Sequence, residues 1–312
     1  MLDFFCHIYS SIRNIHPFLV RIRFYSLLRV LTRLTANCLL PAYFRLTRGN
    51  PRYRLPATEK KNGVIVSFTS FPARIGNIWK VAECMLRQTR KPDRIVLWLS
   101  KQQFADIRSL PKSLLHLQER GLTIALRDND YKSHKKYLYA LQEYPDATVI
   151  TIDDDVFYPT DIVERLLSAA DSHPGCVIAH TAHQIRYDSN GKAFPYAEWE
   201  HYVTHSVHGT DVFQVGIGGV LYPPHSLHND ATDIQSATRY CQNGDDIWLY
   251  VMARLNGTTV AQSGFDNYPL PVYNSNSSAL SLSNLYGGND KQIGQIGKYC
   301  QEHYQSNPFQ NP

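Results

Sequence analysis

The stretch VITIDDDVFYPT, Val149 to Thr160, contains the pattern that decides the fold. An apolar, β-branched run typical of a buried strand ends abruptly in three consecutive carboxylates, Asp153, Asp154 and Asp155. Like charges this close repel one another unless a cation lies between them. The stretch therefore predicts a functional site at the end of a strand, and a solvated acidic loop or a helix cap is the alternative.

Short apolar runs and helix-spaced apolar residues alternate around this stretch. Strands are expected at 64–68, 94–99, 122–126 and 148–152, and helices at 78–86, at 135–143 and from Ile162 onward. Repeated strand–helix units predict an α/β, Rossmann-like fold with a mostly parallel sheet flanked by helices. Ligands of such sheets bind beyond the carboxyl ends of the strands, where the three carboxylates fall.

The spacing of the carboxylates suggests a metal site. Side chains alternate along an extended chain, so Asp153 and Asp155 are expected on one side and Asp154 on the other. Mg²⁺ or Mn²⁺ takes one or two carboxylates and fills its remaining positions with phosphate oxygens and water. We therefore expect Mn²⁺ or Mg²⁺ at Asp153 and Asp155.

Composition narrows the class of protein. The 312 residues are 43% apolar and 19% charged, which supports a folded core. The six cysteines are scattered without a C-x-x-C pair, so reduced thiols in the cytoplasm are expected in place of a zinc site or a disulfide framework. No G-x-S-x-G, P-loop or H-E-x-x-H motif supports a serine hydrolase, a P-loop NTPase or a zincin.

The net charge of +5 is unevenly distributed. Residues 1–61 contain eleven Arg or Lys and two acidic residues, Asp3 and Glu59, whereas the remainder holds 21 basic and 25 acidic residues. The body is therefore acidic, which argues against nucleic-acid binding. With Pro51 and Pro56 in a linker-like stretch, the predicted organisation is a leader and linker over 1–61 and one domain over 62–312. Within that domain we expect two halves, at about 62–158 and about 159–290, and a C-terminal tail.

Residues 18–40 predict a basic amphipathic helix. One face is apolar and the other polar: the first holds Val20, Phe24, Leu27, Leu28, Leu31 and Leu34, and the second holds Arg21, Ser26, Arg29, Thr32 and Arg33. Such a helix suits an anionic membrane surface, with packing on its own domain or on a partner chain as the alternative. No run of eighteen apolar residues predicts a transmembrane helix. We expect a peripheral protein on the cytoplasmic face of the membrane, which deletion of residues 1–48 releases without loss of the activity of the domain over 62–312.

The D-x-D pattern after an apolar strand resembles glycosyltransferases of the GT-A fold. Four further stretches resemble bacterial cell-surface polysaccharide glycosyltransferases, family 2-like, in the same order along the chain. These are VSFTSFPARI (66–75), LRQTRKPDRIVLWLS (86–100), GIGGVLYPPHSL (216–227) and NGDDIWLYVMARLNG (243–257). The likeness covers about 64–257 and does not include the leader.

The resemblance implies that the half at about 62–158 binds the donor and the half at about 159–290 binds the acceptor. The donor site would be built from several loops. The loop after the first strand would bind the nucleotide, through Thr69, Ser70, Phe71, Pro72 and Arg74. Lys135 and Lys136 would neutralise the diphosphate, with two solvated lysines as the alternative, and Asp130 would position them or the ribose. Asp154 would contact the donor sugar or the ribose, and Gly218 and Gly219 would border the sugar site. Asp153 and Asp155 correspond to the metal pair of the family.

Asp245 and Asp246 open the helix expected at 247–255. An acceptor hydroxyl must lose its proton as it attacks, and a carboxylate within hydrogen-bond distance can take it. The resemblance favours Asp246 as this base. The alternative is that an Asp here caps the helix, and capping by one is compatible with catalysis by the other.

The expected function is a metal-dependent glycosyltransferase of the hexosyltransferase type. It would move a sugar from a nucleotide-sugar donor, with a UDP-sugar favoured, to a glycan or lipid-linked acceptor. A single base predicts inversion, and retention stays open. The alternatives are a non-catalytic sugar- or nucleotide-binding protein of the same fold and a haloacid-dehalogenase-like phosphatase, which also has D-x-D after a strand but near the chain start.

Overall fold

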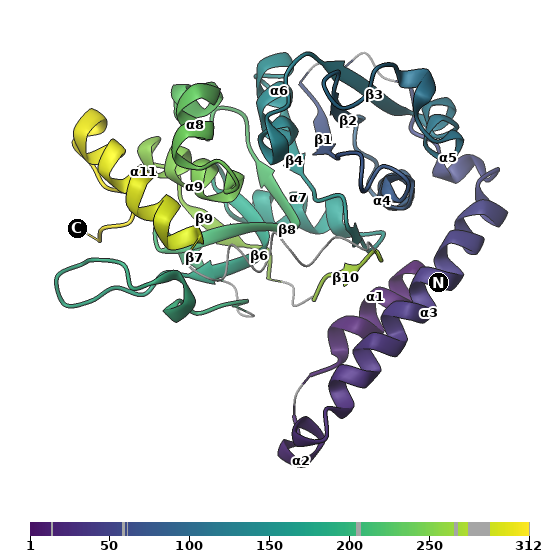
Figure 1. Cartoon of the computed structure of the whole chain (residues 1–312), viewed down its shortest axis with the longest axis horizontal. Coiled ribbons are helices and arrows are strands. Elements are labelled where there is room, and N and C mark those ends of the chain that lie inside the picture. The colour runs from purple at the N-terminus through teal and green to yellow at the C-terminus, as the bar shows by residue number, and fades with distance from the viewer. Residues whose placement is uncertain are drawn as a thin grey trace.

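The computed structural model describes residues 1–13, 15–57, 60, 62–203, 207–264, 268–273 and 288–311. The body contains an eight-stranded sheet with the order β3-β2-β1-β4-β8-β6-β9-β7 (Figure 1). Its strands are β1 Val64–Thr69, β2 Arg94–Ser100, β3 Leu122–Arg127, β4 Thr148–Thr151, β6 Val177–Gln184, β7 His208–Gly209, β8 Val212–Tyr222 and β9 Val260–Gln262. A separate antiparallel pair joins β5 Val156–Phe157 to β10 Leu270–Pro271.

Strands β1 to β4 all run in one direction. β1 pairs in parallel with both β2 and β4, and β2 pairs in parallel with β3. Their carboxyl ends therefore meet at one edge of the sheet, which we call the rim. β8 runs antiparallel between β4 and β6, so the sheet is mixed beyond this point. The predicted α/β, Rossmann-like fold is confirmed, and the four predicted strands lie within a residue or so of their expected positions.

Alternate residues of the central strands pack into two separate cores. On β1, Val66 and Phe68 belong to one core and Ile65 belongs to the other. The first core includes residues of α4 Ile78–Leu86, α5 Lys112–Leu115 and α7 Ile162–Ser172. The second includes residues of α6 Lys135–Glu143, α8 Ile234–Tyr240, α9 Asp245–Leu255 and α11 Asn289–Tyr304. Because both faces of the sheet are covered, most positions of β1, β2, β4, β6 and β8 are buried.

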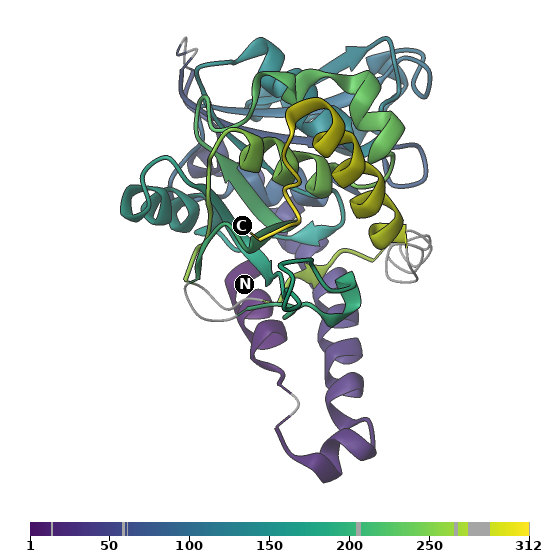
Figure 2. The same ribbon diagram turned by 90° about the vertical axis from the view of Figure 1, so that its left-hand side faces the viewer.

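The leader forms a helical hairpin that projects from the body. It consists of α1 Leu2–Ser11, α2 Pro17–Arg21 and α3 Phe24–Thr47, with α2 at the end far from the sheet (Figures 1 and 2). The prediction of one helix over 18–40 is wrong, because the chain turns at Ile22 and Arg23, where Arg23 has a left-handed φ of 57°. No helix within the described ranges is long and apolar enough to cross a membrane.

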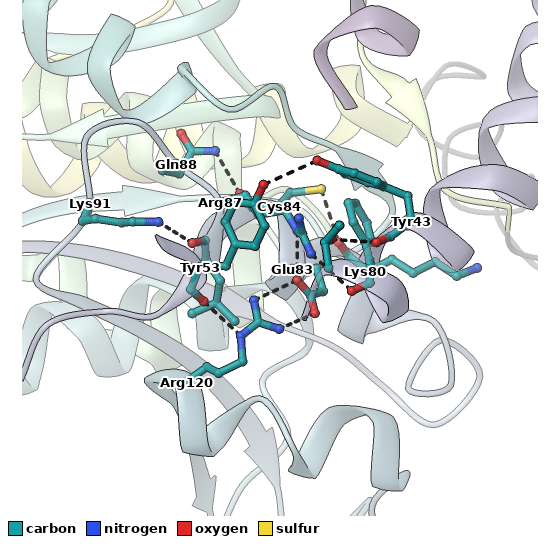
Figure 3. Close-up of polar contacts among 12 residues, drawn as sticks. Tyr43, Tyr53, Lys80, Glu83, Cys84, Arg87, Gln88, Lys91 and Arg120 are labelled. Atoms are coloured by element: carbon teal, nitrogen blue, oxygen red, sulfur yellow. Dashed lines mark hydrogen bonds and ion pairs between the residues drawn. The ribbon is translucent and has the colours of Figure 1, made fainter. Parts of the chain in front are cut away.

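The base of the hairpin is part of the body's first core. Leu40 and Phe44 of α3 are fully buried there, and α1 contributes further buried residues. The guanidinium of Arg87 lies 3.9 Å from the ring centroid of Tyr53. Glu83 accepts hydrogen bonds from Arg87 Nε at 3.0 Å and from an Arg120 guanidinium nitrogen at 3.0 Å (Figure 3). A buried cluster of two arginines and one glutamate, closed by an aromatic ring, therefore joins leader and body.

Candidate active site

The rim gathers the carboxylates that the sequence singled out. Asp153, Asp154 and Asp155 follow β4 after a single residue, Ile152. Because Thr151 of β4 pairs with Val220 of the antiparallel β8, the glycines that precede Val220 extend past the end of β4. α9 begins at Asp245 and packs on the same side of the sheet as α6. Two acidic groups that are about ninety residues apart in the chain therefore reach one edge of the sheet.

Lys136 connects these two acidic groups. Its Nζ lies 2.8 Å from Asp153 Oδ1 and 2.8 Å from Asp245 Oδ2. Burial alone would lower the pKa of this lysine, but the charges of Asp153, Asp245 and Asp246 outweigh it and raise the pKa well above its ordinary value. The ammonium group therefore stays charged at neutral pH and holds the two carboxylates on either side of it.

Asp154 and Asp155 share a second cation. Arg74 Nη1 lies 2.5 Å from Asp154 Oδ1 and 3.0 Å from Asp155 Oδ2, and Ser70 Oγ donates to Asp154 Oδ2 at 2.7 Å. The prediction that Asp154 points away from its neighbour is wrong, because these two residues form a turn and the alternation of the strand stops before them. Ser70 and Arg74, which were expected at the donor nucleotide, hold Asp154 in place.

The carboxylates predicted as metal ligands are the more open ones. The side chains of Asp153 and Asp155 are 28% and 24% exposed, against 8% for Asp154. Burial and then the charge of Asp153 raise the pKa of Asp155 to about 6. A divalent cation would relieve this crowding of like charges. No cluster of three or more His, Cys, Asp or Glu able to hold a metal occurs among the described residues. Lys136 and Arg74 already pair with Asp153 and Asp155, and a Mn²⁺ or Mg²⁺ ion at these two carboxylates stays a prediction.

Asp245 and Asp246 have opposite electrostatic surroundings. Burial would raise the pKa of Asp245, but Lys136 and His134 outweigh it and lower that pKa below its ordinary value. Burial and then the charge of Asp245 raise the pKa of Asp246 to about 7. Asp246 Oδ2 accepts a hydrogen bond from Gly216 N at 2.9 Å. The N-cap residue of α9 is Gly244, with no side-chain cap, so neither Asp holds the capping position. A carboxylate that titrates near neutrality suits a general base.

Glycines of β8 allow this close packing. A Cβ at Gly216 would lie 2.8 Å from Asp246 Oδ1, so a larger residue there would displace that carboxylate. Gly218 and Gly219 have φ values of 102° and 104°, in the left-handed region that favours glycine. A Cβ at Gly218 would also lie 2.8 Å from Thr181 Oγ1. The glycines thus have structural reasons to be present, and a role of Gly218 and Gly219 at a sugar stays a prediction.

The remaining predicted donor residues lie at or behind the rim. Thr69 Oγ1 donates to Trp98 O at 2.7 Å, and Phe71 and Pro72 follow in a partly exposed loop. Lys135 is almost fully buried and forms an ion pair with Asp130. The alternative of two solvated lysines is therefore wrong, since carboxylates hold both Lys135 and Lys136. Contacts of these residues with a donor stay predictions.

Two side chains at the rim were missed by sequence reasoning. Tyr158 is buried, and its hydroxyl accepts from Asp153 N at 2.8 Å. His134 is also buried, with Nε2 2.8 Å from Cys241 O, and its charge lowers the pKa of Asp245. The contact of His134 joins distant segments, whereas Tyr158 lies only five residues from Asp153. A lone Tyr or His has no local pattern that could have revealed them.

No family model and no curated protein matches the sequence. Among solved structures, TarS of S. aureus in complex with UDP is similar over 78% of this chain and 72% of its own, with 11% identity and a TM-score of 0.42. CMP:2-keto-3-deoxy-manno-octonic acid synthetase with CTP is similar over 65% and 89%, with 12% identity and a TM-score of 0.38. HddC of Yersinia pseudotuberculosis is similar over 52% and 77%, with 13% identity and a TM-score of 0.33. No conclusion about activity rests on likeness this distant.

Proposed function

We propose that this protein is a metal-dependent glycosyltransferase that uses a nucleotide-sugar donor. The observation that carries the proposal is the pair of contacts from Lys136 Nζ to Asp153 and to Asp245, each 2.8 Å long. They bring a carboxylate set suited to a metal–diphosphate complex next to a carboxylate set suited to proton removal. Glycosyl transfer needs both, because a leaving group must depart as an acceptor hydroxyl attacks.

Asp246 acts as the base in the proposed reaction. Its carboxylate takes the proton of the acceptor hydroxyl while the acceptor oxygen forms a bond to the anomeric carbon of the donor. The bond between that carbon and the diphosphate oxygen breaks, and its electron pair leaves on the diphosphate. This single displacement inverts the anomeric centre. Asp245 stays ionised beside Lys136 and helps to keep the pKa of Asp246 near neutrality.

Asp153 and Asp155 would hold Mn²⁺ or Mg²⁺, which when bound offsets the charge of the leaving diphosphate. Arg74 and Ser70 fix Asp154 and thereby the turn that presents Asp155. Phe71, partly exposed in the loop after β1, offers an aromatic face to the nucleotide base. We favour a UDP-sugar as donor and a glycan or lipid-linked glycan as acceptor.

Donor hydrolysis and donor binding, measured side by side, test the proposal. UDP release from UDP-sugars with and without Mn²⁺ is compared with the thermal shift caused by the same ligands. Asp155→Ala and Asp246→Asn should each lower turnover on the order of a hundredfold or more. Asp171→Asn, which removes an exposed carboxylate at the end of α7, should have no effect.

Two results would overturn the proposal. Stabilisation by nucleotide sugars without turnover of any of them would identify a non-catalytic binding protein. Hydrolysis of simple phosphate esters that depends on Asp153 would identify a phosphatase. Turnover that survives chelation of divalent ions would remove the metal from the proposal. The activity of Asp246→Asn would then be the test of Asp246 as the base.

A further inference from the structure

Over residues 24–34, the part of α3 before its buried residues, the polar face points inward and the apolar face points outward. Arg29 Nη2 donates to Ile12 O at 2.7 Å, and the Arg29 guanidinium lies 5.5 Å from the ring centroid of Tyr268. Arg33 is half-buried on the same side. The opposite side is an exposed line of apolar residues, which we call the outer stripe: Phe24, Leu27, Leu31 and Leu34, between 38% and 55% exposed. A surface helix of a globular body normally has the reverse arrangement.

The apolar surface continues around the end of the hairpin. Ile15, Phe18, Val20 and Ile22, which we call the tip, are between 44% and 77% exposed. They lie in and beside α2, at the end of the hairpin that points away from the sheet (Figures 1 and 2). Contiguous exposed apolar surface of this kind marks a contact with another molecule or a membrane.

The charge of the hairpin indicates which partner this surface fits. Residues 4–57 contain no Asp or Glu, and residues 12–35 contain five arginines. Arg21 and Arg23 are exposed beside the tip. Apolar side chains with cations at their border match the headgroup region of an anionic membrane. A two-fold contact between copies of this chain would instead bring the same cationic surfaces together.

We propose that the tip and the outer stripe insert into the surface of a membrane that contains anionic lipid. From Phe24 to Leu34 the stripe spans about 15 Å along the helix. The hairpin thus contacts the membrane with its end and one side while its arginine-lined inner side stays on α1. This mode differs from a single helix over 18–40 lying flat. It does not rest on the reaction proposed above, because it depends on residues far from the rim.

Vesicle flotation tests this inference with the full-length chain. Wild-type protein should float with phosphatidylcholine vesicles that contain phosphatidylglycerol, less with phosphatidylcholine alone, and less at high salt. The double variant Leu27→Glu/Leu31→Glu should reduce the bound fraction at least tenfold. Leu46→Glu is the matched control, because Leu46 is an exposed leucine of the same helix outside the outer stripe. It should float like the wild type.

Parallel measurements separate the other outcomes. Both variants should melt at the wild-type temperature and keep wild-type donor hydrolysis, so loss of flotation cannot be attributed to unfolding or to a damaged rim. Wild-type protein that stays with the soluble fraction, or a double variant that floats like the wild type, overturns the inference. A wild-type dimer in sedimentation that the double variant turns into a monomer would show that copies of this chain cover the surface instead.

Discussion

Asp246 combines a raised pKa with the position of a base. Burial and the adjacent negative charge of Asp245 both disfavour its ionised form, and a pKa of about 7 results. A base works only when it is deprotonated. The activity of the proposed enzyme should therefore rise with pH through this value, whereas an aspartate with an ordinary pKa would place the same rise near pH 4.

The pH profile of kcat/KM for acceptor glycosylation checks this assignment. In the wild type the acidic limb should have its midpoint near pH 7. Asp245→Asn removes the negative charge that raises the pKa of Asp246. It also leaves the positive charge of Lys136 less compensated, which lowers that pKa further. The limb should therefore move to lower pH. Asp171→Asn should leave the limb in place. A limb that moves upward in Asp245→Asn, or does not move, contradicts a base at Asp246.

Single residues differ in how far sequence alone could identify them. Asp153 and Asp155 follow an apolar run whose type and length are readable, so their position at the rim could be inferred, whereas only the family resemblance assigned Asp245 and Asp246 to the site. The sequence analysis assigned Lys136 to a diphosphate. Its two carboxylate partners, Asp153 and Asp245, are distant in the sequence, so the residues around Lys136 do not reveal them. The ion pairs of Arg74 depend on a turn at Asp154. The prediction assumed that side chains keep alternating as in a strand, so it could not anticipate this turn.

At the scale of elements, the contact between α3, α4 and η3 (Gln118–Arg120) depends on one buried acid. Glu83 is 2% exposed and binds both Arg87 and Arg120. Removal of one partner from a buried ion pair leaves the other charges uncompensated, which typically costs about 3–5 kcal/mol. Glu83→Gln should therefore lower the free energy of unfolding by about this amount.

Urea denaturation measures the effect directly. Glu119→Gln is the control, since Glu119 is exposed in the same region, and it should change the free energy of unfolding by less than about 0.5 kcal/mol. Equal stability of Glu83→Gln and wild type would mean that Glu83 contributes no net stabilisation to the junction. A double variant that also replaces Arg87 by Met should recover part of the loss, because one buried cation is then absent.

The elements were predictable where their pattern was long and regular. Buried strands with β-branched runs and the helix at 135–143 follow from spacing alone. The break at Ile22–Arg23 was not visible, because the apolar spacing continues across it while the backbone turns. α1 was not predicted. Its buried residues Leu2, Phe5, Cys6 and Tyr9 do recur at helical spacing, so this helix could have been predicted from the sequence.

At the scale of the whole molecule, the hairpin has two parts with different roles. The half near the body supplies Leu40 and Phe44 to the first core, whereas the residues of α3 before Ala36 bury no side chain completely. The expectation that residues 1–48 form a separable leader treats both parts alike. The structure separates them near Tyr9 on α1 and Ala36 on α3, which are the buried residues closest to the tip on each helix.

Two deletions therefore differ in outcome. Deletion of residues 1–48 removes Leu2, Phe5, Leu40 and Phe44 together, and loss of a single such side chain costs about 2–5 kcal/mol, so the sum approaches the whole stability of a domain. We expect this chain to be insoluble or to lack a cooperative melting transition.

Replacement of residues 12–35 by a short Gly/Ser linker removes the tip and the outer stripe but keeps the four core residues. That chain should stay soluble, melt cooperatively and no longer float with anionic vesicles. Solubility and thermal melting of both deletions decide the matter, since a stable, soluble chain without residues 1–48 would show that the base of the hairpin is dispensable for the core.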